Sequence, residues 1–161
     1  MILSTHAIVG GAIASLLPSH PAAAAIVGFA SHFAIDAIPH WDYPLHSISL
    51  GKGANNRRLP FSSATLTDFA IIGIDASAGF GLALWIFAAE GSIWTIAIGA
   101  FAAMLPDGLQ FLHTLHPRGF LHMLQRFHWR IHSKLALDGV FGVGSQLAFA
   151  GMVAALARSI H

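Results

Sequence analysis

Long apolar runs, separated by shorter polar segments, dominate the pattern of this chain. A helix needs about 20 mostly apolar residues to cross the hydrocarbon core of a bilayer. Five runs predict such helices, at residues 4–17, 22–38, 64–89, 92–111 and 134–157. Gly and Ala recur in these runs, and small residues let helices pack closely in lipid. The pattern predicts an all-α, polytopic membrane helix bundle with about five transmembrane helices, forming a single integral membrane domain over residues 1–161.

Two longer connections between these runs carry much of the polar character. Residues 43–63 are expected to form a long loop. Residues 112–133 place apolar side chains at helical spacing, with Arg and His around the rest; these apolar residues are Phe120, Leu124, Phe127 and Ile131. This arrangement is typical of an amphipathic helix that lies in the membrane interface.

Lys and Arg are distributed unevenly between the two sides of this topology. Of the 8 such residues, all but Arg158 fall on one side, namely Lys52, Arg57, Arg58, Arg118, Arg126, Arg130 and Lys134. Cytoplasmic loops of membrane proteins carry an excess of positive charge. We therefore expect that side to face the cytoplasm.

Composition supports the membrane assignment and narrows the chemistry. Apolar residues make up 55 % of the 161 residues and charged residues only 9 %, whereas soluble domains carry about 25 % charged residues. The formal net charge of +1 gives no reason to expect nucleic acid as a partner. Because the chain has no cysteine, thiolate metal sites are excluded. Any metal must be held by carboxylates or by the unusually abundant histidines, which number 11.

Histidine and aspartate gather at the expected cytoplasmic ends of the helices. The segment "SHFAIDAIPHWD" at residues 31–42 contributes His32, Asp36, His40 and Asp42. Side chains four residues apart lie on the same face of a helix, so His32 and Asp36 can reach one ion. His128 and His132 repeat this spacing before the last run. Neutral imidazole together with carboxylate suits Zn²⁺, and also Mn²⁺ or Fe²⁺.

These positions predict a metal site that holds one or two ions. Its expected ligands are His6, His32, Asp36, His40, Asp107, His128 and His132. Asp42 or Asp68 is expected to bridge metals or to act as a general base, and Arg130 to bind phosphate. The alternative is a hydrogen-bonded polar cluster that locks the helix ends together without a metal.

The sequence does not decide whether several further polar residues belong to this site. They are Asp75, His46, His113, His116, His122 and Asp138. Asp75 lies about 10 Å deeper than Asp68 at 1.5 Å per residue. It is expected either to orient a ligand or to act as a structural partner. Asp138 lies four residues after Lys134, so a plain ion pair is the alternative to a place in the site.

Metal and arginine together indicate phosphoester chemistry. Zn²⁺ lowers the pKa of bound water to about 7 and polarises phosphoryl oxygens, and Arg matches phosphate geometry. The chain has no G-x-S-x-G nucleophile motif, so metal-activated water is the simplest nucleophile. We expect hydrolysis of a phosphoester in a membrane lipid or lipid-linked substrate. The alternatives are a metal-ion transporter and a non-catalytic membrane protein with a structural metal. Whether the chain forms a homo-oligomer is left open.

Three short motifs resemble a known family. "STHAIVGGAIASLLPS", "LPD" and "HWRIHS" are similar to motifs of the small bacterial inner-membrane proteins identified as membrane-bound metal-dependent hydrolases. The resemblance implies metal positions at His6, Asp107, His128 and His132. The sequence "LPDGLQF" lacks the second Asp and the His that usually follow in that family. Residues 31–42 also resemble, more loosely, the ligand region of zinc-dependent phospholipase C and single-strand nucleases.

Overall fold

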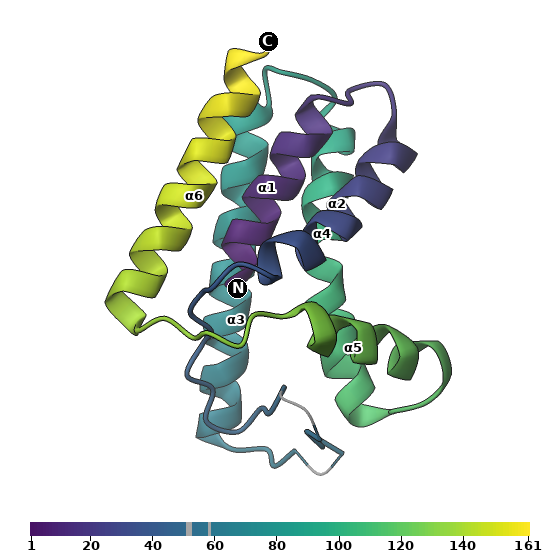
Figure 1. Cartoon of the computed structure of the whole chain (residues 1–161), viewed down its shortest axis with the longest axis vertical. Helices are drawn as coiled ribbons and strands as arrows, with labels where there is room; N and C mark the ends of the chain where they lie inside the picture. Colours follow the sequence, from purple (N-terminus) through teal and green to yellow (C-terminus); the bar gives the residue numbers. More distant parts are fainter. Residues whose placement is uncertain (51–52, 58) are drawn as a thin grey trace.

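The computed structural model of the protein describes residues 1–50, 53–57 and 59–161 and is all-helical over these ranges (Figure 1). Its helices are α1 (Leu3–Ser15), α2 (Pro21–Asp36), α3 (Ser63–Phe87), α4 (Ile93–Leu115), α5 (Gly119–Ile131) and α6 (Gly139–Ser159). The helix α1 lies at the centre and contacts α2, α3, α4 and α6. Lys52 and Arg58, two of the charges used to orient the chain, lie outside the described residues.

Of the helices in the described ranges, three are long and apolar enough to cross a membrane: α3, α4 and α6, with 25, 23 and 21 residues. The expected count of five spanning helices is not supported. The helices α1 and α2 have 13 and 16 residues, so they measure about 20 and 24 Å at 1.5 Å per residue. Both are shorter than the roughly 30 Å hydrocarbon core, as the apolar runs at residues 4–17 and 22–38 already were.

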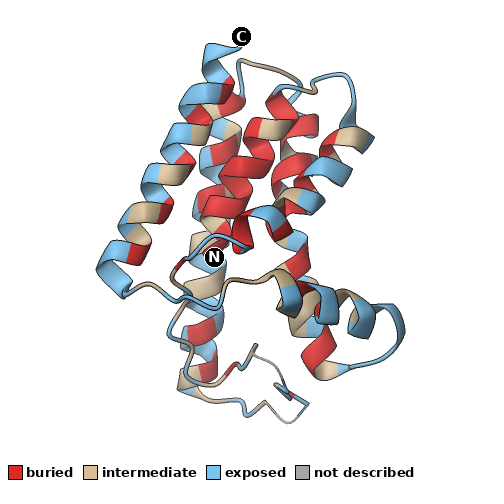
Figure 2. Ribbon diagram, viewed as in Figure 1, coloured by how far each residue is buried: buried red, intermediate tan, exposed pale blue. Residues whose placement is uncertain are grey.

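The central helix α1 is buried on almost every face, whereas α3 and α6 expose apolar side chains on their outer faces (Figure 2). Glycines allow this close packing. A Cβ atom added to Gly28 would lie 2.7 Å from the carbonyl oxygen of Gly99, and one added to Gly99 would lie 2.7 Å from that of Gly10. Gly99 therefore lets the backbones of α1, α2 and α4 meet, as small residues do in membrane bundles.

The buried N-terminus of α1 is capped by side chains from three other segments. The first N–H groups of a helix have no partner within it. Here Ile2 N donates to Oε1 of Gln146 at 2.9 Å, Leu3 N to the hydroxyl of Tyr43 at 2.8 Å, and Ser4 N to Oδ2 of Asp75 at 2.9 Å. Asp75 thus has the structural role that the sequence left open, and these caps fix where α1 begins.

Expected helix boundaries differ most from the structure at α4, α5 and α6. The amphipathic helix expected over residues 112–133 corresponds to α5, Gly119–Ile131. The helix α4 continues through Pro106 to Leu115, past the expected end at residue 111. The helix α6 begins at Gly139 rather than at residue 134, because the side chain of Asp138 caps it by accepting from Phe141 N at 3.0 Å. Lys134 donates instead to the carbonyl of Trp129 at 2.6 Å. Asp138 is therefore a helix cap.

Candidate metal centre

Side chains from four helices meet where α1 begins and α2 ends. The residues are His6 in α1, His32 and Asp36 in α2, Asp107 in α4 and His128 in α5. The three histidines and Asp36 are at most 2 % exposed. These helices are distant in sequence, so the fold brings together five of the seven expected ligands.

The carboxylate of Asp36 lies at the centre of this group. Its Oδ2 atom is 2.9 Å from Nε2 of His128 and 3.3 Å from Nε2 of His32. Its Oδ1 atom is 3.2 Å from Nε2 of His6. The Oδ1 atom of Asp107 lies 3.5 Å from the same His32 nitrogen. Three imidazole rings therefore face one carboxylate, and a second carboxylate lies beside them.

A second group of polar side chains lies in the connection after α2. The backbone there is held against the connection after α5, because Ser133 N donates to the carbonyl of Asp36 at 2.8 Å and Leu137 N to that of His40 at 3.0 Å. This pairing brings His40 and Asp42 next to His132. Nε2 of His40 is 3.2 Å from Oδ1 of Asp42, and Nε2 of His132 is 3.7 Å from Oδ2 of Asp42.

The donor atoms form two groups that share one residue. One group contains His32, Asp36, Asp107 and His128, and the other contains Asp36, His40 and His132. Within each group the donor atoms lie within 4.8 Å of one another. His6 adjoins the first group and stacks on His32, with ring centroids 4.0 Å apart. Either group can hold a metal ion, and Asp36 is placed to contribute to both.

Backbone carbonyls orient three of the rings. The Nδ1 atoms of His32, His40 and His132 lie 2.9, 2.7 and 3.0 Å from the carbonyl oxygens of Ala103, Ile38 and Ser133. Donation from Nδ1 leaves Nε2 with its lone pair free, and this is the arrangement by which proteins fix a metal-binding histidine. In all three rings Nε2 is the atom that faces the carboxylates.

Buried nitrogen atoms without a hydrogen-bond partner bear on whether the centre fits a metal ion. Nε2 of His6, His32 and His40 is buried and has no hydrogen-bond partner among the described residues. Leaving such a buried polar atom unpaired costs about 1–3 kcal/mol. Nε2 of His128, which lies 2.9 Å from Asp36, is hydrogen-bonded. A metal ion would accept the lone pairs of these nitrogen atoms, so the donor set fits a metal ion.

The amino group of the chain supplies a positive charge at this centre. The amino group of Met1 lies 3.0 Å from Oδ1 of Asp36 and 2.9 Å from Oδ1 of Asp42. Burial alone would raise the pKa of Asp42, but His40 and this amino group lower it below its usual range. Asp42 is thus an ionised carboxylate, and its side chain is 54 % exposed.

Asp68 lies elsewhere in the fold. Its carboxylate accepts from the backbone N–H groups of His46, Ser47 and Ile48 at 2.9, 2.6 and 2.9 Å. His46 also contacts it through Nδ1 at 3.3 Å. Since its oxygens hold the loop that follows α2, the expected role of Asp68 as metal bridge or base finds no support.

The other histidines whose role was open also lie apart from the two donor groups. Nε2 of His113 is 3.2 Å from Nδ1 of His122, so these two form a pair of their own between α4 and α5. His116 is the residue at which α4 ends. Neither His46 nor these three belongs to a donor group in the described ranges.

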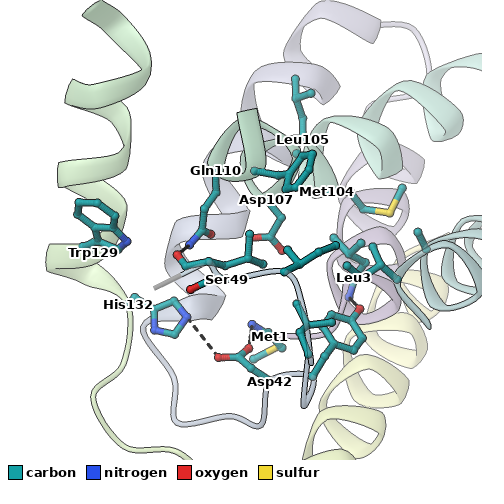
Figure 3. A pocket seen from close by; sticks show the side chains of 18 of the residues that line it. Met1, Leu3, Asp42, Ser49, Met104, Leu105, Asp107, Gln110, Trp129 and His132 are labelled. Atoms are coloured by element: carbon teal, nitrogen blue, oxygen red, sulfur yellow. Dashed lines mark hydrogen bonds and ion pairs between the residues drawn. The ribbon is translucent and has the colours of Figure 1, made fainter. Parts of the chain in front are cut away.

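A cavity of about 1290 Å³ adjoins the centre (Figure 3). Asp42, Asp107 and His132 come from three separate segments and line it together. Arg130 also lines the cavity, as do Arg126 and Lys134. The residue expected to bind phosphate is therefore in the same cavity as the metal donors.

Two features of the site were not expected from the sequence. The carboxylate that belongs to both donor groups is that of Asp36. The sequence had suggested Asp42 or Asp68 as the residue that bridges two metals. Tyr43 lines the cavity and caps α1, and burial and its hydrogen bond to Asp75 raise its pKa above the usual range. A signal was present, because Tyr43 is the single tyrosine of the chain and follows Asp42 directly.

Comparison of the chain with protein-family models, with curated proteins and with solved structures found no match. The site therefore has to be interpreted from its own geometry.

Proposed function

We propose that the chain is a membrane-embedded metal-dependent hydrolase that cleaves a phosphoester of a lipid or lipid-linked substrate. The observation that carries this proposal is the pair of donor groups sharing Asp36, placed beside a cavity that also contains Arg126 and Arg130. Metal donors and guanidinium groups facing one space suit a phosphate ester, because Arg binds its oxygens in a fixed geometry.

The donor set favours Zn²⁺, with Mn²⁺ or Fe²⁺ as alternatives, since it combines imidazole with carboxylate and contains no sulfur. A bound ion would supply an activated water and polarise a phosphoryl oxygen. His32, Asp107 and His128 would hold one ion with Asp36, and His40 and His132 a second. In hydrolysis the water oxygen forms a bond to phosphorus, and the ester oxygen leaves with a proton.

Two residues outside the donor groups have assigned roles in this reaction. Asp42 lines the cavity, and its Oδ1 atom lies 3.2 Å from Nε2 of His40, so it is placed to orient the attacking water. Arg130 lines the same cavity and would bind the phosphate oxygens.

We also propose that the chain belongs to the membrane-bound metal-dependent hydrolases that its motifs resemble, with the site toward the cytoplasm of a bacterial inner membrane. The support is the position of Arg126, Arg130 and Lys134 beside the centre together with the positive-inside rule. Labelling of single-cysteine variants from each side of the membrane would test the orientation, since the chain has no cysteine of its own.

The test of activity is release of phosphate or headgroup from phospholipids and lipid phosphates in mixed micelles. We expect turnover that stops with a chelator and returns with Zn²⁺ or Mn²⁺. Asp36→Asn should reduce the rate by about 100-fold or more, because it weakens both donor groups. Asp138→Asn is the control, since Asn also caps helices well. An equal rate in Asp36→Asn and the control would refute the proposal.

A metal-ion transporter is the alternative from another class. Its path would need polar groups through the full depth of the bundle, and α1 beyond His6 is formed by Gly, Ala, Ser and aliphatic residues. Glu90 and Arg158 at the opposite end pair with each other at 3.1 Å. Zn²⁺ flux into proteoliposomes, in the absence of any hydrolysis, would favour transport.

A further inference from the structure

The cavity beside the metal centre has two chemically different parts. One part carries the ionisable side chains named above: Asp42, Asp107, His132, Arg126, Arg130 and Lys134. The other part is formed by apolar side chains of α3 and α4: Phe69, Ile72, Ala76, Phe101, Leu105 and Phe111. A ligand that fills both parts must therefore be amphiphilic.

The apolar part is open on the side of the two long helices. Phe101 is 59 % exposed, Phe69 45 % and Leu105 36 %. Both α3 and α4 are long and apolar enough to cross a membrane. In a membrane spanned by these helices, the exposed side chains would face hydrocarbon, and a lipid could reach the cavity from within the bilayer.

The depth of the centre supports entry from the side. Asp107 lies about 21 Å along α4 from Ile93, at 1.5 Å per residue. This is less than the roughly 30 Å thickness of the hydrocarbon core. Measured from Ile93, Asp107 therefore lies within the depth of the hydrocarbon core, and a chain attached to a phosphate there would continue along α3 and α4.

The cavity is also large enough for a chain as well as a headgroup. Its volume of about 1290 Å³ exceeds the roughly 300–1,000 Å³ of pockets that hold drug-sized ligands. A bilayer is as apolar as these walls, so burial of the chain gives little selectivity. Selectivity would come from the cationic side chains, which attract a phosphate and not a neutral lipid.

We infer that the apolar part of the cavity is a binding site for the hydrocarbon chain of a lipid phosphate, which enters sideways from the bilayer between α3 and α4. Its phosphate lies against Arg126, Arg130 and Lys134, next to Asp42 and His132. This inference rests on the proposed function in one respect: the bound lipid is a substrate only if the chain is a hydrolase. Binding itself is a separate property and needs no turnover.

The test uses the full chain, chelator-treated, in phosphatidylcholine nanodiscs. The probe is phosphatidic acid with a photoreactive diazirine on its acyl chain, and peptide mass spectrometry maps the crosslinks. We expect crosslinks concentrated on the cavity-lining residues of α3 and α4, and suppressed by excess unlabelled phosphatidic acid. Glycerol 3-phosphate and inorganic phosphate should not compete at equal concentration. Diacylglycerol with the same diazirine should label α6 as strongly as α3.

Substitutions make the test specific to the cavity. Ala76→Phe would fill the apolar part, and we expect at least a fivefold loss of crosslinking. Ala78→Phe is the matched control, because Ala78 is exposed on the same helix and does not line the cavity. Arg126→Gln with Arg130→Gln should reduce labelling by phosphatidic acid to that by diacylglycerol.

The outcomes separate this inference from the proposed function. Even labelling around the bundle, or equal labelling in Ala76→Phe and Ala78→Phe, overturns the chain site even if the protein hydrolyses soluble phosphate esters. Competition by glycerol 3-phosphate overturns it as well, because the phosphate alone would then account for binding. Crosslinks confined to the cavity in a protein without hydrolase activity support the chain site and contradict the proposed function.

Discussion

Asp36 has the most constrained environment of any carboxylate in the site. It is 1 % exposed and lies within 3.3 Å of nitrogen atoms from His6, His32 and His128. The spacing of His32 and Asp36 identified both residues from the sequence, because four residues make about one helical turn. The sequence did not show that Asp36 is shared by two donor groups, since this depends on how two distant connections pair.

Asp68, in contrast to Asp36, is a carboxylate whose partners the sequence did not identify. A carboxylate in an apolar run needs a partner, and the sequence suggested metal or histidine. Its main partners are backbone N–H groups of the preceding loop. No pattern of side chains reveals such a partner.

The role of Asp68 gives a prediction about stability. Asp68→Ala should leave three loop N–H groups without their acceptor, at a cost of about 1–3 kcal/mol. We expect a lower unfolding temperature in detergent together with unchanged metal content, as measured by circular dichroism and elemental analysis. Loss of the metal at unchanged stability would place Asp68 in the site and contradict this assignment.

At the scale of elements, the sequence predicted where α1, α2 and α3 lie to within two residues, but it placed the end of α4 four residues too early and the start of α6 five residues too early. The range 64–89 differs from α3 by one residue at its start and two at its end, because an exposed apolar helix has the composition of a membrane span. The first two runs also looked like spans. They form the shorter α1 and α2, since Ser15 and Asp36 end these helices. Burial in the bundle and exposure to lipid select similar residues.

The glycine contact of α1, α2 and α4 is a second feature with a measurable consequence. Gly99→Ala should destabilise the bundle by about 1–3 kcal/mol through overpacking, because the new Cβ would lie 2.6 Å from Cβ of Ala14. Gly73→Ala is the matched control, since nothing lies within 4 Å of a Cβ there. It should be neutral or stabilising by up to about 1 kcal/mol.

Thermal or denaturant unfolding of both variants in the same detergent checks this prediction. Equal stability of Gly99→Ala and Gly73→Ala would mean that the three backbones are not in close contact.

At the scale of the whole molecule, the bundle gathers its His and Asp side chains where the short helix α1 begins and the short helix α2 ends. The helices α3 and α4 continue past that point, and with α5 and the loop after α2 they enclose the cavity. The sequence indicated which residues would lie close together at this end of the bundle, because His and Asp recur at helix ends in an otherwise apolar chain; their role as ligands stays a prediction. These residues are His6, His32, Asp36, His40, Asp107, His128 and His132. The cavity was not predictable, since its walls come from four helices and two loops.

The central claim is that the shared donor groups bind a metal ion. The most direct measurement is the Zn, Mn and Fe content per chain of the purified protein, by plasma mass spectrometry after metal loading and gel filtration. We predict one or two bound ions, in accord with the two donor groups, lost in Asp36→Asn and retained in Asp138→Asn. A folded wild-type chain that retains no metal after loading would contradict the claim.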